Sequence, residues 1–321
     1  MSLATAVPSE HARGRVSTVD RLLEAVARRR PDAVALVAPD RPPLTYGRLA
    51  RQILDLLEAL ARIEIGRGDR VAVALPPGPE LAVTVLALSA GATCAPLNPA
   101  HRPRECEAYL ARLDAKALVV EAGVDSPARA AAVGHGIRLV ELSRAPRGEA
   151  GVLILASSPD GEPAPRSAPR PDDIALLLPT SGTTSASKLV PLSHANLCAS
   201  ARGIGASLGL EPTDRCLNLM PVFHVHGFMA LLASLAAGAS VVCLPSFDAS
   251  RAFAWMDETR PTWCTAIPAI HRAILAQADL HRKSSRVGRS DSSDPPRLPY
   301  PAPFGSGWNA PSRLPSSRPT A

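Results

Sequence analysis

A run of small hydroxylated residues followed closely by a lysine is the part of this sequence best suited to bind an anion. The run follows an apolar segment, and the lysine comes three residues after Ser185, which ends the run. Short side chains let backbone N–H groups crowd around phosphate oxygens, and the hydroxyls and the ammonium group add further donors. The same residue types are also common in exposed turns, which is the alternative for this segment taken alone. The candidate phosphate-binding residues are Thr180, Ser181, Gly182, Thr183, Thr184 and Lys188.

Two further motifs contain side chains capable of catalysis. His224 and His226 stand one residue apart, which is compatible with catalysis, metal binding or a structural role at a helix start. Two histidines without a further ligand cluster make a poor metal site, so we predict no metal. Residues 205–209 (GASLG) match the G-x-S-x-G elbow of hydrolases, in which Ser207 would be the nucleophile. That elbow needs a preceding strand, whereas residues 195–203 have a helical pattern, so we expect Ser207 near a helix end.

The segments around these motifs alternate between short apolar runs and longer runs of helical period. This alternation predicts β-α units on doubly wound, mainly parallel sheets of an α/β fold. One helix is expected to begin after Thr45, which would be its N-cap. Its apolar stripe consists of Leu49, Ile53, Leu56, Leu57 and Leu60. A second helix is expected from about Glu80 to Gly91. The predicted strands are apolar throughout, as in strands covered on both faces, and span 70–75, 117–121, 152–156, 174–178, 216–220, 240–244 and 262–266.

Composition and charge narrow the classes of protein to which this chain can belong. Its 321 residues are 46% hydrophobic and 20% charged, which suits a folded domain with a large core. Most of the net charge of +6 lies in residues 281–321, so the rest lacks the basic surface of a nucleic-acid binder. The six cysteines form no C-x-x-C pair and are expected to be small buried hydrophobes. Without a signal peptide, a membrane-length apolar run or a C-terminal peroxisomal signal, we expect a soluble cytoplasmic protein.

The phosphate-loop candidate resembles that of the adenylate-forming (AMP-dependent) acyl-CoA synthetase and ligase family, whose pattern is T-S-G-T-T-G-x-P-K-G-V followed by H-x-N. The match includes Lys188, His194 and Asn196, and this chain differs at Ser185, Ser187 and Leu189. The T-S-G-T-T-S and H-V-H-G variants resemble the oxalate–CoA ligase branch. Further motifs match in the order of the family: residues 44–46 (LTY), 68–71 (GDRV), 91–92 (GA), 96–98 (PLN), 221–227 (PVFHVHG) and 262–268 (TWCTAIP).

The resemblance implies both a fold and a reaction. The fold would be the N-terminal domain of acyl-activating ligases, and the reaction would use ATP to activate a small carboxylate before transfer to coenzyme A. Mg²⁺ would be held largely by the phosphates. The hydroxylated loop and Lys188 would bind the β- and γ-phosphates, and His224 would lie beside the acyl group and the α-phosphate. His194 and Asn196 would fix the helix after the loop.

The end of the sequence departs from the family pattern. The adenine-side motif, the ribose-binding aspartate, the hinge and the C-terminal domain with its catalytic lysine are not found after Asp279. We expect a flexible segment at 1–16, a partial AMP-binding domain at 17–280 and a disordered Pro/Ser/Arg-rich tail at 281–321, which resembles out-of-frame or alternatively spliced translation. An incomplete ligase is the main hypothesis. The alternatives are a non-catalytic remnant that binds phosphate or a partner, and a hydrolase using Ser207.

Overall fold

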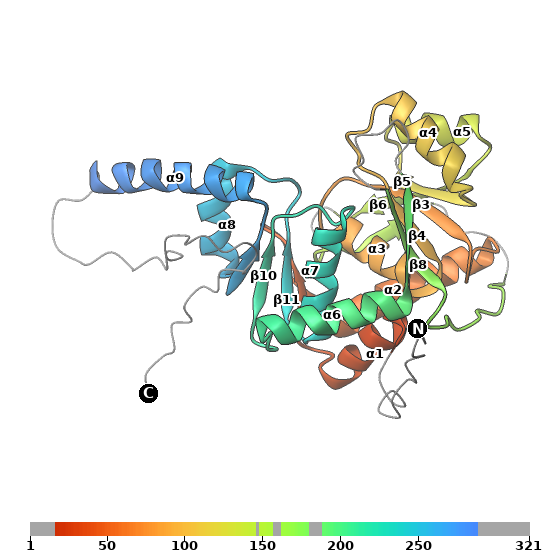
Figure 1. The fold of residues 1–321 in the computed structure, drawn as a ribbon, viewed down its shortest axis with the longest axis horizontal. Helices are drawn as coiled ribbons and strands as arrows, with labels where there is room; N and C mark the ends of the chain where they lie inside the picture. The colour runs from red at the N-terminus through yellow and green to blue at the C-terminus, as the bar shows by residue number, and fades with distance from the viewer. Residues whose placement is uncertain (1–16, 146–147, 157–161, 180–187, 288–321) are drawn as a thin grey trace, which may run out of the picture.

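Two β-sheets, with helices between and outside them, form the described part of the chain (Figure 1). The computed structural model describes residues 17–145, 148–156, 162–179 and 188–287. Sheet A has five strands in the order β12-β10-β11-β1-β2, and sheet B has seven in the order β7-β6-β5-β3-β4-β8-β9. Neighbouring strands run parallel except in the pairs β1–β2, β6–β7 and β8–β9. The predicted doubly wound, mainly parallel α/β fold is therefore confirmed.

Strands and helices alternate along the chain. Sheet A consists of β1 (Val34–Val37), β2 (Leu44–Thr45), β10 (Arg215–Asn218), β11 (Ser240–Cys243) and β12 (Trp263–Thr265). Sheet B consists of β3 (Arg70–Ala74), β4 (Thr93–Pro96), β5 (Ala117–Glu121), β6 (Arg138–Arg144), β7 (Leu153–Leu155), β8 (Ile174–Pro179) and β9 (Leu189–Ser193). The helices are α1 (Val19–Arg29), α2 (Tyr46–Arg62), α3 (Pro79–Gly91), α4 (Pro103–Leu113), α5 (Pro127–Gly134), α6 (His194–Leu208), α7 (Val225–Ala236), α8 (Ala252–Thr259) and α9 (Pro268–Val287).

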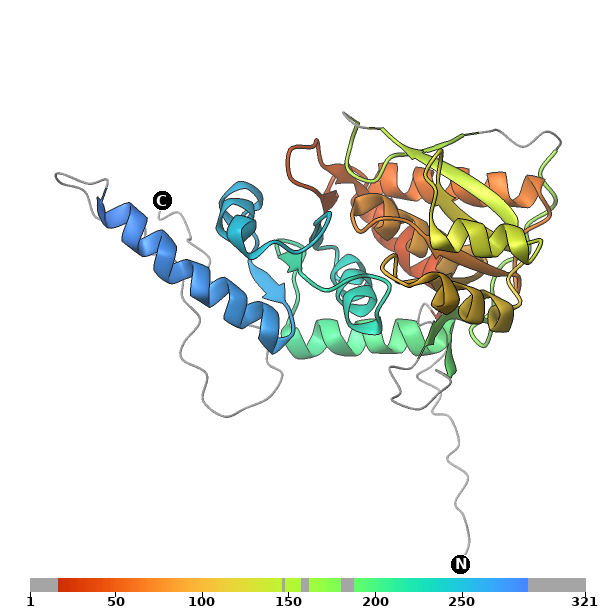
Figure 2. The same cartoon turned by 90° about the horizontal axis from the view of Figure 1, so that it is seen from above.

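The main hydrophobic core lies between the two sheets. Buried residues of α1, α2, α3, α6 and α7 form one cluster with Val71 of sheet B and Val241 of sheet A. The predicted N-cap of α2 is confirmed, because the Thr45 side chain accepts a hydrogen bond from the Arg48 N–H group. Helix α6 runs past both sheets (Figure 2). The shared core therefore holds the two sheets as one unit.

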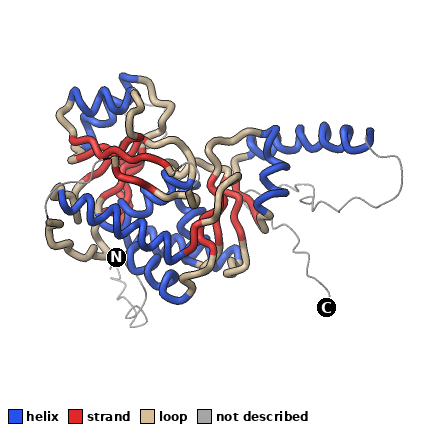
Figure 3. The backbone as a smooth tube through the Cα atoms, turned by 180° about the vertical axis from the view of Figure 1, so that it is seen from behind, coloured by secondary structure: helices blue, strands red, loops and turns tan. Residues whose placement is uncertain are grey.

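Separate apolar clusters cover the outer faces. Helices α4 and α5 pack on sheet B, while α8 and the start of α9 pack on sheet A. The rest of α9 projects away from the body (Figure 3). This helix continues to Val287, past the boundary expected at 280. Residues 281–287, predicted to be part of a disordered tail at 281–321, are therefore helical, whereas residues 288–321 and the segment 1–16 predicted to be flexible lie outside the described residues.

Each of the seven predicted strands is present, with bounds that differ by no more than two residues. The predicted strands did not include β1, β2, β4, β6 or β9. The hydrolase elbow is absent from the structure, because residues 205–208 are the last turn of α6 and no strand leads directly into them. Ser207 lies in the last turn of that helix, where the sequence placed it. Gly209 then ends the helix with a φ of +54°, a conformation that favours glycine.

Candidate functional site

Doubly wound sheets bind ligands at the carboxyl ends of strands whose connections leave toward opposite faces. In sheet A the strand β10 has such a parallel neighbour on each side, β11 and β12, and we consider the pair β10 and β12 because a side-chain hydrogen bond joins their connections. The connection after β10 leads into α7 in the main core, whereas β12 leads into α9, whose Ile274 packs in the cluster on the outer face. We call the carboxyl ends of β10 and β12 the A switch point (Figure 1). The topology makes it the first candidate for a site.

Hydrogen bonds hold the connection from β10 to α7 in one conformation. The side chain of Asn218, the last residue of β10, accepts from the Met220 N–H group at 3.2 Å and donates to the Gly227 carbonyl at 2.9 Å. Asn218 is buried, so its bond to the Gly227 carbonyl is shielded from water, and the bond from Met220 is partly shielded. A Cβ atom at Gly227 would collide with the carbonyl oxygens of Met220 and Pro221. The strand end and the first turn of α7 are therefore closely packed.

His224 occupies the N-cap position of α7. Its backbone N–H group donates to the Pro221 carbonyl at 3.1 Å, and its ring packs against Phe223 with the ring centroids 4.7 Å apart. The residue stays exposed to solvent. Partial desolvation lowers the pKa of the imidazole, and the nearby His101 lowers it further. His224 is therefore neutral near pH 7 and can donate or accept a hydrogen bond.

A second histidine lies in the first turn of α7. The Nε2 atom of His226 is 2.6 Å from the hydroxyl oxygen of Thr265, the last residue of β12. Partial desolvation lowers the pKa of this imidazole as well. No group of three or more His, Cys, Asp or Glu side chains that could hold a metal ion is found in the part of the chain that the structure describes.

Two residues near the predicted site were not singled out from the sequence. His101 lies in the connection from β4 to α4, and its charged form would lower the pKa of the His224 imidazole, so a residue from the sheet B side contributes to the electrostatics of this histidine. Thr265 stands inside the T-W-C-T-A-I-P segment, and the register of β12 beside β10 brings it to His226. Neither contact has a local sequence signal, because each joins residues that are far apart in the chain.

The structure describes one of the six predicted phosphate-binding residues. Thr180, Ser181, Gly182, Thr183 and Thr184 lie outside the described residues, whereas Lys188 is exposed directly before β9. Strands β8 and β9 are antiparallel neighbours that pair Pro179 with Leu189, so both ends of the segment are at the carboxyl end of β8. Strand β8 also pairs with β4, whose connection contains His101. The loop therefore starts on the same side of the molecule as His224, and its role in phosphate binding stays a prediction.

His194 and Asn196 have structural roles. Asn196 forms a reciprocal capping box with Ser193 at the start of α6. The Nδ1 atom of buried His194 accepts a hydrogen bond of 3.1 Å from the Val19 N–H group at the start of α1. Both residues thus fix the helix after the loop, as the sequence indicated.

Sheet B has an equivalent position, the B switch point, at the carboxyl ends of β3 and β5. These neighbours lead into α3 in the main core and α5 on the outer face. The cavity there measures about 10 Å³, which is close to the minimum for one water molecule. Glu80 and Glu121 line it, and each is paired with an arginine, Arg41 and Arg144 respectively.

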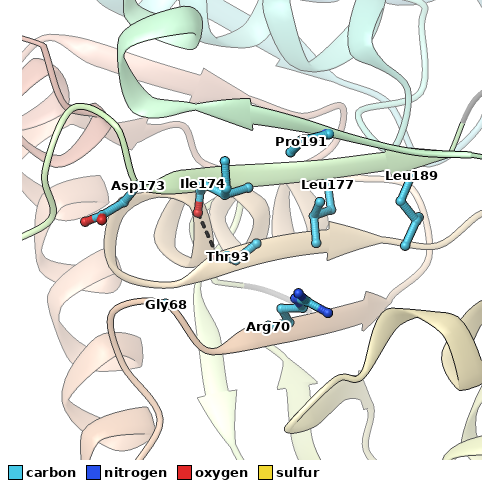
Figure 4. Close-up of a pocket in the computed structure, with 8 residues that line it drawn as sticks. All are labelled: Gly68, Arg70, Thr93, Asp173, Ile174, Leu177, Leu189 and Pro191. Atoms are coloured by element: carbon cyan, nitrogen blue, oxygen red, sulfur yellow. Dashed lines mark hydrogen bonds between the residues drawn. The ribbon is translucent and has the colours of Figure 1, made fainter.

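A larger cavity of about 350 Å³ lies on the outer face of sheet B (Figure 4). Arg70, Thr93 and Ile174, which begin β3, β4 and β8, place much of its wall at the amino ends of these strands. Ligands of doubly wound sheets bind at the opposite ends. We therefore assign the candidate site to the A switch point rather than to this cavity.

The cysteines behave largely as predicted. All six are free thiols, and five of them are buried, whereas Cys264 is partly exposed. Burial raises the pKa of the Cys243 thiol to about 12 and that of the Cys198 thiol to about 11, so both stay protonated near pH 7. In the described residues, no helix is both long and apolar enough to cross a membrane.

Comparison with known proteins gives a consistent result. A family model described as AMP-binding enzyme matches residues 23–302 of this chain. Oxalate–CoA ligase of Arabidopsis thaliana is 39% identical over 275 residues, which cover 82% of this chain and 52% of the relative. Sulfoacetate–CoA ligase of Cupriavidus necator is 32% identical and is matched over 80% of this chain and 51% of its own length. The chain therefore spans about half the length of these curated relatives.

Solved structures also match over most of the chain. ATP-bound MatB from Rhodopseudomonas palustris has a TM-score of 0.66 at 26% identity, covering 80% of this chain and 51% of that one. O-succinylbenzoate coenzyme A synthetase from Bacillus subtilis in complex with AMP has a TM-score of 0.67 at 22% identity, with coverage of 80% and 64%. At that identity the second match supports the fold alone.

Proposed function

The chain belongs to the AMP-binding enzyme family, and on that premise we propose that it forms the substrate-binding part of an AMP-forming ligase joining a carboxylic acid to coenzyme A. The observation that carries this proposal is the position of His224. It lies exposed and neutral at the A switch point, where the fold binds ligands, in the segment that matches the H-x-x-G motif of the family. The relatives named above are ligases of the same reaction type.

The reaction needs positioned groups more than covalent chemistry from the protein. A carboxylate oxygen attacks the α-phosphorus of ATP, the bond from that phosphorus to the bridging oxygen breaks, and pyrophosphate leaves with the electron pair. The coenzyme A sulfur, as thiolate, then attacks the carbonyl carbon of the acyl adenylate, and AMP leaves. His224 would donate a hydrogen bond to an oxygen that gains negative charge in the first step. Lys188 and the hydroxyls of Thr180, Ser181, Thr183 and Thr184, with the Gly182 backbone, would stabilise the leaving pyrophosphate.

Magnesium is the one metal ion that this reaction calls for, as the counter-ion of the nucleotide. The described residues at the A switch point offer imidazoles, a hydroxyl and an amide rather than a set of carboxylates. This donor set fits an ion that is bound mainly through phosphate oxygens and water. When bound, the ion would neutralise charge on the leaving pyrophosphate.

The substrate class that we favour is a short acid of the oxalate type. It is supported by the TSGTTS and HVHG segments and by the 39% identity to an oxalate–CoA ligase. A reducing compartment such as the cytoplasm fits the six free cysteines. A remnant that binds phosphate without catalysis is the second candidate, since the matched region is about half the length of the relatives.

Acid-dependent exchange of radioactive pyrophosphate into ATP tests this proposal on the purified chain. We expect exchange that requires oxalate and Mg²⁺, and that falls strongly in His224→Ala. ATP binding measured by calorimetry separates the two candidates, because the remnant would bind ATP without exchange. No exchange with oxalate, with other short acids or with aromatic acids would overturn the ligase proposal.

A further inference from the structure

The hydrogen bond between His226 and Thr265 connects the two strands of the A switch point. His226 belongs to the helix that follows β10, whereas Thr265 is the last residue of β12. The two residues are 39 positions apart, and their side chains meet at 2.6 Å. The bond therefore joins two elements at the place where their chain connections diverge.

The first turn of α7 is thus held from two sides. On the β10 side, Asn218 binds the Gly227 carbonyl, and on the β12 side, Thr265 binds the ring of His226. His224 begins the same turn, since its carbonyl accepts the first helical hydrogen bond from the Phe228 N–H group at 3.0 Å. A shift of this turn would displace the His224 imidazole as well.

The two anchors differ in their surroundings. Asn218 and Gly227 are buried, whereas the bond between His226 and Thr265 is exposed to solvent. An exposed hydrogen bond adds little to the stability of the fold, because water replaces it when it breaks. It can still restrict the direction in which the helix turn and its side chains point. Loss of this bond should therefore affect geometry at the site more than folding.

We propose that His226 is a positioning residue, whose bond to Thr265 holds the first turn of α7, and with it His224, against the carboxyl end of β12. This inference rests on the proposed function, in which His224 contacts the reacting groups. It adds Thr265 as the partner through which β12 contributes to the site.

Variants of Thr265 test the proposal, with oxalate-dependent pyrophosphate exchange as the readout. Thr265→Val removes the hydroxyl and keeps the shape of the side chain. We expect kcat to fall about tenfold, which corresponds to the free energy of one hydrogen bond, with little change in the KM for ATP. Thr265→Ser keeps the hydroxyl and should restore the rate. His226→Ala should cause a similar loss, and the double variant should lose no more than either single one. The matched control is His135→Ala, which removes an exposed histidine at the C-cap of α5 and should behave as wild type.

The outcomes separate this proposal from the one on which it depends. If the wild type catalyses exchange and Thr265→Val catalyses it at the same rate, the positioning role alone is overturned. Equal losses in Thr265→Val and Thr265→Ser, or additive losses in the double variant, would do the same. A wild type without exchange would overturn the ligase function and this inference together. The melting temperatures of all variants should match the wild type, and the ¹⁵N ring shift of His226 should change in Thr265→Val.

Discussion

At the B switch point the charged side chains are paired with one another, whereas at the A switch point two histidines are exposed to solvent. The topology is the same in both places, because each joins neighbouring strands whose connections leave toward opposite faces. At the B switch point, Arg41 from the loop between β1 and β2 pairs with Glu80 of α3 and also donates to the carbonyls of Ala145 and Glu149 at 3.1 and 2.8 Å. Topology thus indicates where a ligand could bind. The charged groups at the B switch point already have partners within the protein, whereas the exposed histidines at the A switch point can still bind a ligand.

The largest effect is expected from breaking the pair at the B switch point. Glu80→Ala should lower the free energy of unfolding by about 3–5 kcal/mol, because the buried Arg41 guanidinium loses its counter-ion. The side chains of Arg41 and Glu80 are only 14% and 7% exposed. Urea unfolding measures the change. Glu24→Ala, which breaks an exposed pair with Arg28, is the control and should change stability by less than about 0.5 kcal/mol.

Measuring ATP binding by the folded Glu80→Ala protein tests whether the B switch point has a structural role, in contrast to the A switch point. A structural role for the B switch point predicts an unchanged dissociation constant at a temperature where the variant is folded. A variant of normal stability with weakened ATP binding would reverse the roles assigned to the two switch points.

Packing at the A switch point should give the next largest effect. Gly227→Ala would place a methyl group against two backbone carbonyls, so we expect a loss of about 3 kcal/mol in unfolding free energy and of most pyrophosphate exchange. Gly203→Ala is the matched control, since Gly203 lies in α6 with open space around it. That change should be neutral or stabilise the protein by up to about 1 kcal/mol. Equal behaviour of the two variants would contradict the close packing of the strand end against α7.

A third prediction separates chemistry from stability at the A switch point. His224→Ala should slow exchange about 100-fold, because the neutral imidazole would no longer stabilise charge in the transition state. Its melting temperature should stay near that of the wild type, since the residue is exposed. His135→Ala again serves as the control for removal of an exposed histidine. Unfolding of His224→Ala in parallel with its loss of exchange would make His224 a structural residue.

Local sequence patterns predicted the elements better than the contacts between them. Helix α2 could be predicted from its apolar stripe and its N-cap from Thr45, because both signals come from residues that are close together in the sequence. Strand β6 was not among the predicted strands, since its residues alternate between buried and less buried positions near the edge of sheet B. His224 could be proposed from its motif, whereas Thr265 depends on the register of β12 beside β10. Register is set by the packing of the whole sheet, which no short segment encodes.

The smallest predicted effect is a pH-dependent loss of stability at the contact between α1 and α6, two helices of the core between the sheets. His194 lies at the start of α6, and its Nδ1 atom must be unprotonated to accept the hydrogen bond from Val19. Burial lowers the pKa of this imidazole, although Asp20 and Asp173 oppose the shift. The unfolded chain therefore binds a proton at about pH 6.5, where the folded chain does not. Stability should be fully present above that pH and should fall as the pH drops toward the folded-state pKa.

Urea unfolding at pH 7.5 and pH 5.5 measures the total loss, to which His224 and His226 also contribute because their pKa values are lowered too. The part of the loss that disappears in His194→Gln belongs to His194. Asp173 stays ionised over that range, because hydrogen bonds from Arg67 hold its pKa at about 2, so it does not add to the change. The loss should be smaller than those above, because the two carboxylates offset part of the burial effect. Since α1 and α6 pack in the core shared by both sheets, the loss should appear as one cooperative transition. Separate transitions for the two sheets would show that the switch points belong to independently folding parts.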